Sequence, residues 1–430
     1  MKQVMMLKSF MTCFSDNTSC LSVWCYNLVV VENIRNRIWN QGDFEMTDYN
    51  FLQPLALRHG GNLRNRTVFA PTTLSASFFN GVASTDDVEY YRHRAGGVGL
   101  VIVGASYVDD LGRGFPGQLG ISADNQLAGL KRLVGAIHDG GAKAVVQLHH
   151  AGRMSYSDLL PGGQAPVAPS EIPNTPDSET PRALTDSEIR EIIEDFGSAT
   201  KRAIDAGFDG VEIHGANHYL LQQFFSPSSN KRTDSWGTDR TSFPLAVAHK
   251  VADVIRDNAE PGFILGYRIS PEETNVDGYR IDDTVEFAQQ LTNEVPLDYL
   301  NLSQPVANQS PFVSPEIKTP VAKLYRDALP EDVAVLAVGN VRKGQDAEAA
   351  LTDTGADLVG LAVELIIEPK WVEKVAAGQE DALNQKLSEL DYVDLHLPQA
   401  TVDSLLKPMF GEVVPWAGSD NEVAEHGTML

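Results

Sequence analysis

A cluster of polar side chains follows a short apolar run in the middle of the chain. The run Gly210–His214 has the length and the β-branched content of a buried strand. His214 ends it, and Asn217 and Tyr219 follow within five residues. An imidazole and an amide three residues apart can donate hydrogen bonds to one point, where they would hold a carbonyl or nitro oxygen as negative charge develops on it.

Tyr219 adds a proton donor to this cluster. Its phenol, with an ordinary pKa near 10, is protonated at neutral pH and can transfer its proton in a reaction. We therefore predict that His214, Asn217 and Tyr219 are catalytic. The alternative is structural: His214 would end the strand, and Asn217 would satisfy the backbone of a turn.

Four histidines near the predicted strand ends raise the alternative of metal chemistry. His149 and His150 follow another apolar run, and His214 and His218 are spaced by four, as in a metal-binding pair on a helix. The adjacent glutamate of the zinc-protease motif is missing, and no further ligand is evident. We therefore expect no metal site and keep a metal-dependent barrel hydrolase or lyase as an alternative function.

Two further polar residues end apolar runs. Arg268 ends the run that starts at Phe263, and an arginine buried at a strand end is costly unless it faces an anion. We expect that anion to be an electron-rich cofactor or substrate group, with an internal salt bridge to Glu212 as the alternative. Gln147 ends another run, and its amide can both donate and accept, which suits the edge of a heterocycle.

Glycines and cations near the last two apolar runs suggest a phosphate site. Gly339 and Asn340 follow the seventh run, Gly360 lies within the eighth, and Arg342 and Lys343 are nearby. Loops at these places form the usual phosphate site of α/β barrels, although a glycine in a turn is the commoner explanation. The chain has no G-x-G-x-x-G after a strand and no P-loop, so a nicotinamide cofactor would not bind through a Rossmann unit.

The elements that must position these residues form a repeat of apolar runs and helix-period segments. Eight runs have the length of buried strands: Thr67–Ala70, Val98–Ala105, Ala142–Leu148, Gly210–His214, Phe263–Ile269, Leu297–Leu302, Val333–Val338 and Ala356–Val363. Alternating strands and helices call for parallel pairing through right-handed crossovers. The predicted fold class is therefore α/β, as a single (β/α)₈ TIM barrel, with an open doubly wound sheet as the alternative.

Helical segments fit between the strands. They are Thr85–Arg94, Ala123–Asp139, Asp186–Ala206, Phe243–Asn258, Ile281–Glu294, Val321–Ala328, Gly344–Asp353 and Pro369–Gly378. Three of them have good candidate N-caps, at Ser84 or Thr85, at Thr185 with Glu188 three residues on, and at Asp282. Two connections are unusually long, Ala151–Leu184 and Ala216–Ser242, and both leave the carboxyl ends of strands. We expect them to form walls of the active site.

Composition excludes several classes of function. The chain has 430 residues and a net charge of −24, so a nucleic-acid partner is not expected. Its cysteines are Cys13, Cys20 and Cys25, all near the start. The main body can therefore hold no disulfide framework, Cys-ligated zinc site, iron–sulfur cluster or catalytic thiol.

The two ends of the chain differ from its body. We expect Met46 to be the natural start and residues 1–45 to be a non-native or disordered leader, with a genuine N-terminal extension as the alternative. Residues 46–418 would form the barrel, and residues 419–430 a flexible tail. The apolar stretch Leu21–Val31 is too short to span a bilayer, so we expect no membrane partner and a cytoplasmic location.

Several separate motifs resemble the Old Yellow Enzyme family, most closely its bacterial NADH:flavin oxidoreductase branch. They occur in the family's order: Asn65-Arg66 with Ala70-Pro71-Thr72-Thr73, Gln147-Leu148 with His150-Ala151-Gly152-Arg153, Glu212 to Asn217 with Tyr219-Leu220, Ser226-Pro227 with Asn230 and Arg232, and the Arg268 strand. The resemblance covers roughly Asp48 to Trp416. It implies an FMN-dependent (β/α)₈ barrel that uses NADH or NADPH as reductant.

The resemblance also implies roles for individual residues. The isoalloxazine ring would be held by Pro71, Thr72, Thr73, Ala105, Gln147 and Arg268. Gly339, Asn340, Ala362 and Val363 would lie at the phosphate. His214 and Asn217 would bind the activating oxygen of an α,β-unsaturated carbonyl or nitro compound. The flavin N5 would deliver hydride to the β-carbon, and Tyr219 would protonate the α-carbon. The partner is thus a small electrophilic alkene; the choice between NADH and NADPH and the oligomeric state, a homo-oligomer included, stay open.

The sequence departs from the family pattern at three places. His218 replaces the usual glycine before the tyrosine, which restricts the backbone there. Ala362 and Val363 replace the usual Gly-Arg, whose arginine grips the FMN phosphate; losing such a charge-assisted bond costs about 1.5–3 kcal/mol. Arg342 or Lys343 could compensate, and a degenerate barrel with weak flavin binding is a further alternative. The segment Trp236–Ser242 is shorter than in the family.

Overall fold

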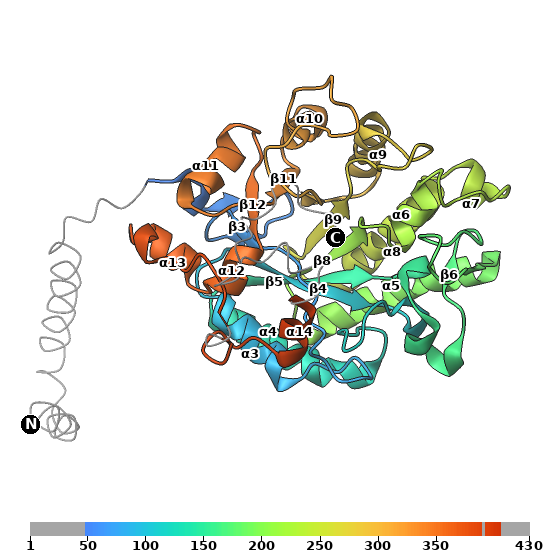
Figure 1. The fold of residues 1–430 in the computed structure, drawn as a ribbon, viewed down its shortest axis with the longest axis horizontal. Helices are drawn as coiled ribbons and strands as arrows, with labels where there is room; N and C mark the ends of the chain where they lie inside the picture. The colour runs from blue at the N-terminus through green and yellow to red at the C-terminus, as the bar shows by residue number, and fades with distance from the viewer. Residues whose placement is uncertain (1–47, 389–391, 406–430) are drawn as a thin grey trace, which may run out of the picture. The chain divides into compact units, whose positions relative to one another are not determined.

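The computed structural model describes residues 48–388 and 392–405 (Figure 1). The predicted leader, residues 1–45, and the predicted flexible tail, residues 419–430, lie outside the described residues. None of the described helices is both long and apolar enough to cross a lipid bilayer.

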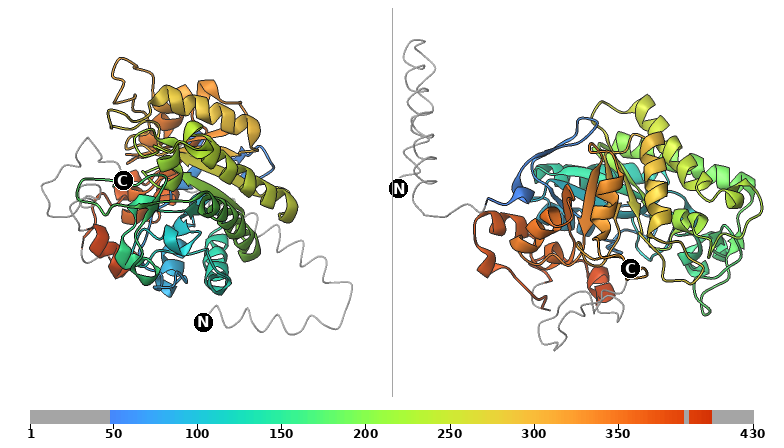
Figure 2. Two further views of the ribbon diagram at one scale, coloured as in Figure 1. Left: turned by 90° about the vertical axis from the view of Figure 1, so that its right-hand side faces the viewer. Right: turned by 90° about the horizontal axis from the view of Figure 1, so that it is seen from above.

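Eight parallel strands close into a barrel, which confirms the predicted fold and makes the open-sheet alternative wrong. They are β3 (Thr67–Phe69), β4 (Leu100–Tyr107), β5 (Lys143–His149), β8 (Gly210–Gly215), β9 (Ile264–Ile269), β10 (Tyr299–Leu302), β11 (Ala334–Val338) and β12 (Leu358–Leu361). Each predicted run overlaps one strand. Closure joins β12 to β3 through the pair Gly360↔Val68, so the blue start of the barrel lies beside its orange end in Figures 1 and 2.

Helices surround the barrel (Figure 2). The predicted ones are α3 (Thr85–Arg94), α4 (Leu127–Asp139), α5 (Asp186–Ala206), α8 (Ser242–Asn258), α9 (Ile281–Glu294), α10 (Val321–Ala328), α11 (Gly344–Thr352) and α13 (Trp371–Ala376). Four short helices were not predicted: α6 (Leu220–Phe225), α7 (Ser235–Thr238), α12 (Val363–Ile367) and α14 (Gln399–Leu405). They have one or two turns, too few for a 3.6-residue pattern to emerge.

Two local predictions were wrong. The eighth strand ends at Leu361, and Val363 begins α12 instead of ending the strand, because the Glu364 side chain turns back to accept from the Ala362 N–H (3.4 Å). Asp282 does not cap α9, which begins after Arg280. There the Asp283 carboxylate accepts from the Arg280 N–H (2.8 Å).

The other caps were predicted correctly. The Ser84 hydroxyl accepts from the Asp87 N–H (3.1 Å), and Asp87 accepts in return from the Ser84 N–H (2.8 Å). Thr185 and Glu188 form the same reciprocal capping box at α5. Each box satisfies two backbone donors that a helix start would otherwise leave unpaired.

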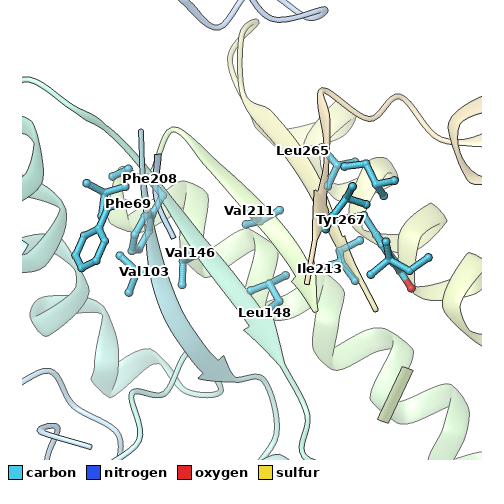
Figure 3. Close-up of a cluster of buried hydrophobic side chains, with 14 of the residues drawn as sticks. Phe69, Val103, Val146, Leu148, Phe208, Val211, Ile213, Leu265 and Tyr267 are labelled. Atoms are coloured by element: carbon cyan, nitrogen blue, oxygen red, sulfur yellow. The ribbon is translucent and has the colours of Figure 1, made fainter. Parts of the chain in front are cut away.

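The core has two layers, divided by the barrel wall. Alternate residues of β4 illustrate this, because Val101 and Val103 pack toward the helices, whereas Leu100 and Ile102 fill the barrel interior. Figure 3 shows part of the outer layer, in which Val146 and Val211 come from neighbouring strands. The short hairpin of β1 (Leu55–Ala56) and β2 (Asn62–Leu63) adds Leu57 and Leu63 to the inner layer.

The two long connections pack against each other at the carboxyl ends of the strands. The first contains the small strands β6 (Val167–Ala168) and β7 (Arg182–Ala183), and the second contains α6 and α7. Arg232 of the second donates to the Pro169 carbonyl of the first (3.1 Å), and the Arg153 N–H donates to the Gln223 side chain (3.1 Å). The connection Ala216–Ser242 also carries Asn217 and Tyr219, which precede α6, so it forms one wall of the barrel mouth, as predicted.

Candidate active site

Strand register places the predicted polar residues in two layers at the mouth of the barrel. Gln147 of β5 pairs with Glu212 of β8, and His214 of β8 pairs with Arg268 of β9. Side chains two residues apart on a strand point to the same face. His149, two residues beyond Gln147, therefore lies at the level of His214 and Arg268, closer to the carboxyl ends of the strands than Gln147 and Glu212. The His149 and His214 ring centroids are 5.6 Å apart.

Arg268 forms no ion pair with Glu212 or any other acid in the described part of the chain. The two Glu212 oxygens instead accept from Gln147 Nε2 (2.6 Å) and Asn301 Nδ2 (2.9 Å). Arg268 is close enough to lower the pKa of Glu212, although burial raises that pKa by more. Its Nε is buried without a hydrogen-bond partner among the described residues. The alternative of an internal salt bridge for Arg268 is therefore wrong, and its buried Nε is a donor without a protein partner among the described residues.

Gln147 occupies the predicted position but has an additional role. Its amide NH₂ holds Glu212, so its carbonyl oxygen is the group left to contact a ligand. Asn301 donates to the other Glu212 oxygen and was not predicted from the sequence. Nothing in the local sequence of β10 indicates such a contact, because it joins strands that are 89 residues apart.

His214 is a neutral hydrogen-bond donor. The Ala216 N–H donates to its Nδ1 (3.3 Å), so the proton of the neutral ring lies on Nε2. Burial, then the charge of Arg268, and then His149 lower the pKa of His214 well below its usual value. The ring is almost fully buried, and its Nε2–H remains available at neutral pH.

Asn217 is oriented by two serines. Its N–H donates to Ser270 Oγ (2.9 Å), and Ser303 Oγ donates to its Oδ1 (2.6 Å). The amide NH₂ is thereby left as a donor. Asn217 and His218 have φ values of 57° and 61°, the left-handed region that favours glycine. The departure of His218 from the family's glycine therefore falls where the backbone makes glycine most useful.

The ring of Tyr219 packs against the imidazoles of His149 and His214. Its ring centroid is 4.9 Å from that of His214 and 4.3 Å from that of His149, with nearly perpendicular planes in both cases. Burial raises the pKa of its phenol, and the Arg268 charge opposes this shift only in part. The phenol is therefore fully protonated at neutral pH and can act as a proton donor.

The four histidines of the metal alternative do not converge. His150 Nδ1 accepts from the Gly152 N–H (3.1 Å), and its Nε2 lies 3.6 Å from Asp109. His218 lies beside Gln222 and Glu273, away from His149 and His214. Within residues 48–388 and 392–405, no group of three or more His, Cys, Asp or Glu side chains has an arrangement that could hold a metal ion.

The residues predicted to hold the isoalloxazine ring lie at the same end of the barrel. Pro71–Thr73 follows β3 directly, and Thr72, Thr73, Gly104 and Ala105 line one small cavity. A Cβ at Gly104 would lie 2.2 Å from the Thr72 carbonyl oxygen, so glycine is required for this loop to lie against β4. The unpaired Arg268 Nε and the Gln147 carbonyl oxygen suit a flat heterocycle with both donor and acceptor groups, which FMN provides.

The residues predicted to lie at the FMN phosphate come from the ends of the last two strands. Gly339 and Asn340 form the turn after β11, and Ala362 and Val363 lead into α12. Arg342 pairs with the buried Glu364 (3.2 Å). Gly360 has a packing explanation, because a Cβ there would lie 2.6 Å from Val338 of the adjacent strand.

The loop after β4 adds two residues beside Tyr219 and His149 that were not predicted from the sequence. Phe115 lies 6.3 Å from both Tyr219 and His149, measured between ring centroids, and Gln118 contacts His149. This loop is shorter than the connections Ala151–Leu184 and Ala216–Ser242, and it has no motif of its own. No local signal in the sequence would have identified these residues.

Comparison with known proteins places the chain in a family. Residues 50–382 match the model of the NADH:flavin oxidoreductase / NADH oxidase family. The chain is 43% identical over 351 residues to an NADH:acrylate oxidoreductase of Vibrio harveyi, covering 80% of this chain and 35% of that protein. It is 40% identical over 370 residues to an NADH:fumarate oxidoreductase of Klebsiella pneumoniae, covering 83% and 40%. The chain thus spans well under half the length of these two relatives.

A shorter relative and two solved structures match over nearly their full length. The probable NADH-dependent flavin oxidoreductase YqiG of Bacillus subtilis is 37% identical over 350 residues, covering 81% of this chain and 93% of YqiG. Morphinone reductase in complex with tetrahydroNAD superposes with a TM-score of 0.67 at 31% identity, covering 78% and 92%. The old yellow enzyme homologue of Zymomonas mobilis has the same TM-score at 26% identity, covering 82% and 99%. The chain therefore belongs to the NADH:flavin oxidoreductase / NADH oxidase family, in the bacterial branch of the Old Yellow Enzymes.

Proposed function

We propose that this protein is an FMN-dependent NAD(P)H oxidoreductase that reduces activated C=C bonds of α,β-unsaturated carbonyl or nitro compounds. The observation that carries the proposal is the arrangement of two neutral donors, His214 and Asn217, next to the protonated phenol of Tyr219 and the unpaired Arg268. FMN, when bound, would supply the redox chemistry that passes a hydride from NAD(P)H to the β-carbon of the alkene.

His214 and Asn217 bind and polarise the activating oxygen of the substrate. Both present N–H donors whose orientation is fixed by neighbours, Ala216 for the imidazole and Ser303 for the amide. Donors that are already oriented need no reorganisation when negative charge moves onto the oxygen during the reaction. Because His214 is neutral, it stabilises this charge without giving up its proton.

Tyr219 holds the proton for the α-carbon. Its phenol is protonated across the physiological pH range, because burial raises its pKa. Phe115 and the two imidazoles surround its ring edge-on and limit its orientations. General-acid catalysis of this kind contributes about 10²–10⁴-fold to a rate.

Arg268, Gln147, Ala105 and the Pro71–Thr73 segment would hold the isoalloxazine ring. Arg268 stabilises negative charge on that ring, and its own burial is tolerated when it meets such an electron-rich partner. Gly339, Asn340, Ala362 and Val363 would lie at the phosphate. Arg342 is the nearby guanidinium that could serve it, although Glu364 already partly neutralises it.

The names of the relatives support this assignment. Acrylate and fumarate are alkenes conjugated to carboxyl groups, and several relatives are named for NADH or NADPH. Because the chain spans well under half of the acrylate and fumarate oxidoreductases, its own substrate is an inference from the site. A cytoplasmic location stays a prediction.

Product analysis tests the proposal. Purified protein supplied with FMN, NADH and 2-cyclohexen-1-one without oxygen should yield cyclohexanone, with one NADH consumed for each product molecule. Absence of cyclohexanone with both NADH and NADPH would refute ene reduction. A protein that also failed to bind FMN would match the degenerate-barrel alternative suggested by Val363.

A further inference from the structure

His149 is a buried histidine whose tautomer is fixed by Gln118. The Gln118 Oε1 accepts from the Gly114 N–H (2.7 Å), and its Nε2 donates to the Ala105 carbonyl (3.0 Å). These two backbone partners determine which end of the amide is NH₂. The second amide proton therefore points at His149 Nδ1, 3.0 Å away, and Nδ1 must accept it. The ring proton of neutral His149 lies on Nε2.

His149 is neutral as well as oriented. Burial, followed by the neighbouring His150, lowers the pKa of His149 to about 3. At neutral pH the ring is therefore an N–H donor without charge. Its orientation parallels that of His214, in which a backbone N–H fixes Nδ1 and leaves Nε2–H as the donor.

The Nε2–H of His149 has no hydrogen-bond partner among the described residues, although the side chain is 0% exposed. A buried donor without an acceptor costs about 1–3 kcal/mol. Such a group calls for an explanation, and a catalytic role is one of the recognised ones. Arg268 Nε also lacks a hydrogen-bond partner among the described residues, and Arg268 pairs in register with His214, which contacts His149. The two unsatisfied donors therefore mark one place at the barrel mouth.

Tyr219 packs against the ring that carries this donor. Its ring is perpendicular to that of His149 at a centroid distance of 4.3 Å. A contact between an N–H and an aromatic ring is weaker than an N–H···O hydrogen bond. Tyr219 is partly exposed, whereas both histidines are buried.

We propose that His149 is a third hydrogen-bond donor for the substrate and selects alkenes whose activating group carries two oxygens on one atom, namely a nitro group or a carboxylate. One oxygen would accept from His214 and Asn217, and the other from His149. A single carbonyl oxygen can satisfy the first pair but leaves the His149 donor unpaired. This inference rests on the proposed function and adds the class of activating group.

Calorimetry with two ligands of the same ring size tests the inference. Oxidised protein with bound FMN and no reductant is titrated with 1-nitrocyclohexene and with 2-cyclohexen-1-one. We expect His149→Phe, which keeps a ring but removes the donor, to weaken nitro binding about tenfold and enone binding less than threefold. His149→Asn restores a side-chain donor and should recover nitro affinity to within about threefold of wild type. Equal losses for both ligands in His149→Phe, or no recovery in a folded His149→Asn, would overturn the inference.

A second measurement does not depend on the cofactor. In protein labelled with ¹⁵N-histidine, the His149 signals are those absent from His149→Phe. They should show a protonated Nε2 and an unprotonated Nδ1 at pH 7, and a protonated Nδ1 would contradict the argument. Reduction of 2-cyclohexen-1-one by wild type tests the proposed function separately. An active wild type with equal losses for both ligands refutes only the role of His149.

Discussion

His214 and Arg268 lie directly opposite each other in the register of β8 and β9, and the charge of the arginine helps to keep the histidine neutral. The His214 imidazole is therefore a donor that does not titrate in the physiological range. The same arginine remains without an ion-pair partner among the described residues. A neutral donor beside a free cation suits a site in which negative charge appears only during the reaction.

Stability should fall when the pH drops below the ordinary histidine pKa. His149 and His214 stay neutral in the folded protein, because their pKa values are lowered, but they take up protons near pH 6.5 when unfolded. Below that pH the unfolded state binds more protons, so each histidine lowers the free energy of unfolding. For His149, whose pKa is lowered to about 3, the loss is about 2 kcal/mol at pH 5. Urea unfolding at pH 7 and pH 5 measures the difference. His214→Asn should show a smaller loss, and an equal loss in this variant would contradict the assignment.

Removing the phenol of Tyr219 should affect one half of the reaction. Tyr219→Phe keeps the ring packed against His149 and His214 but removes the proton donor. We expect reoxidation of the reduced protein by 2-cyclohexen-1-one to slow by about 10²–10⁴-fold. Reduction by NADH should change less than threefold, since it needs no proton from the phenol. Stopped-flow absorbance separates the two steps, and equal slowing of both would show that Tyr219 has a different role.

The left-handed backbone at His218 should have a measurable cost. Its φ of 61° is one that L-residues adopt at a cost of about 1–2 kcal/mol, and glycine avoids that cost. His218→Ala and His218→Gly remove the same imidazole contacts with Gln222 and Glu273. The glycine variant should therefore be the more stable of the two, by about 1 kcal/mol in urea unfolding. An alanine variant of equal or higher stability would mean that the backbone relaxes there.

Restoring the family's arginine should strengthen cofactor binding through the phosphate alone. Val363 is the first residue of α12, where the family typically places that arginine. Val363→Arg should raise FMN affinity by about 10- to 100-fold, the gain expected from one charge-assisted hydrogen bond. Riboflavin, which lacks the phosphate, is the control, and its affinity should not change. A parallel gain for riboflavin would place the effect elsewhere in the site.

The elements of this fold could be predicted because each has a local cause. The eight strands are short runs of buried apolar residues, and α3 and α5 begin at capping boxes that are visible as Ser84 and Thr185 with their acidic partners. His214, Asn217, Tyr219 and Arg268 could be proposed from strand ends and motifs. The barrel then brings them together, because parallel strands end at the same side.

The contacts that orient these residues could not be predicted in the same way. Ser303 lies 86 residues from Asn217, and Gln118 lies 31 residues from His149. Such pairs depend on strand register and loop conformation, which one sequence does not specify locally. His149 was considered only as a metal ligand, since its sequence neighbour His150 suggested a pair. In the structure, His149 contacts Gln118, whereas His150 lies beside Asp109.

The absorbance spectrum of the purified protein, recorded without oxygen before and after NADH and then after an alkene, tests the central claim most directly. The account predicts a yellow protein with the spectrum of bound FMN, bleaching on addition of NADH or NADPH, and return of the yellow colour on addition of 2-cyclohexen-1-one. A protein that remains colourless after incubation with FMN, or whose bleached form is not reoxidised by 2-cyclohexen-1-one or 1-nitrocyclohexene, would contradict it.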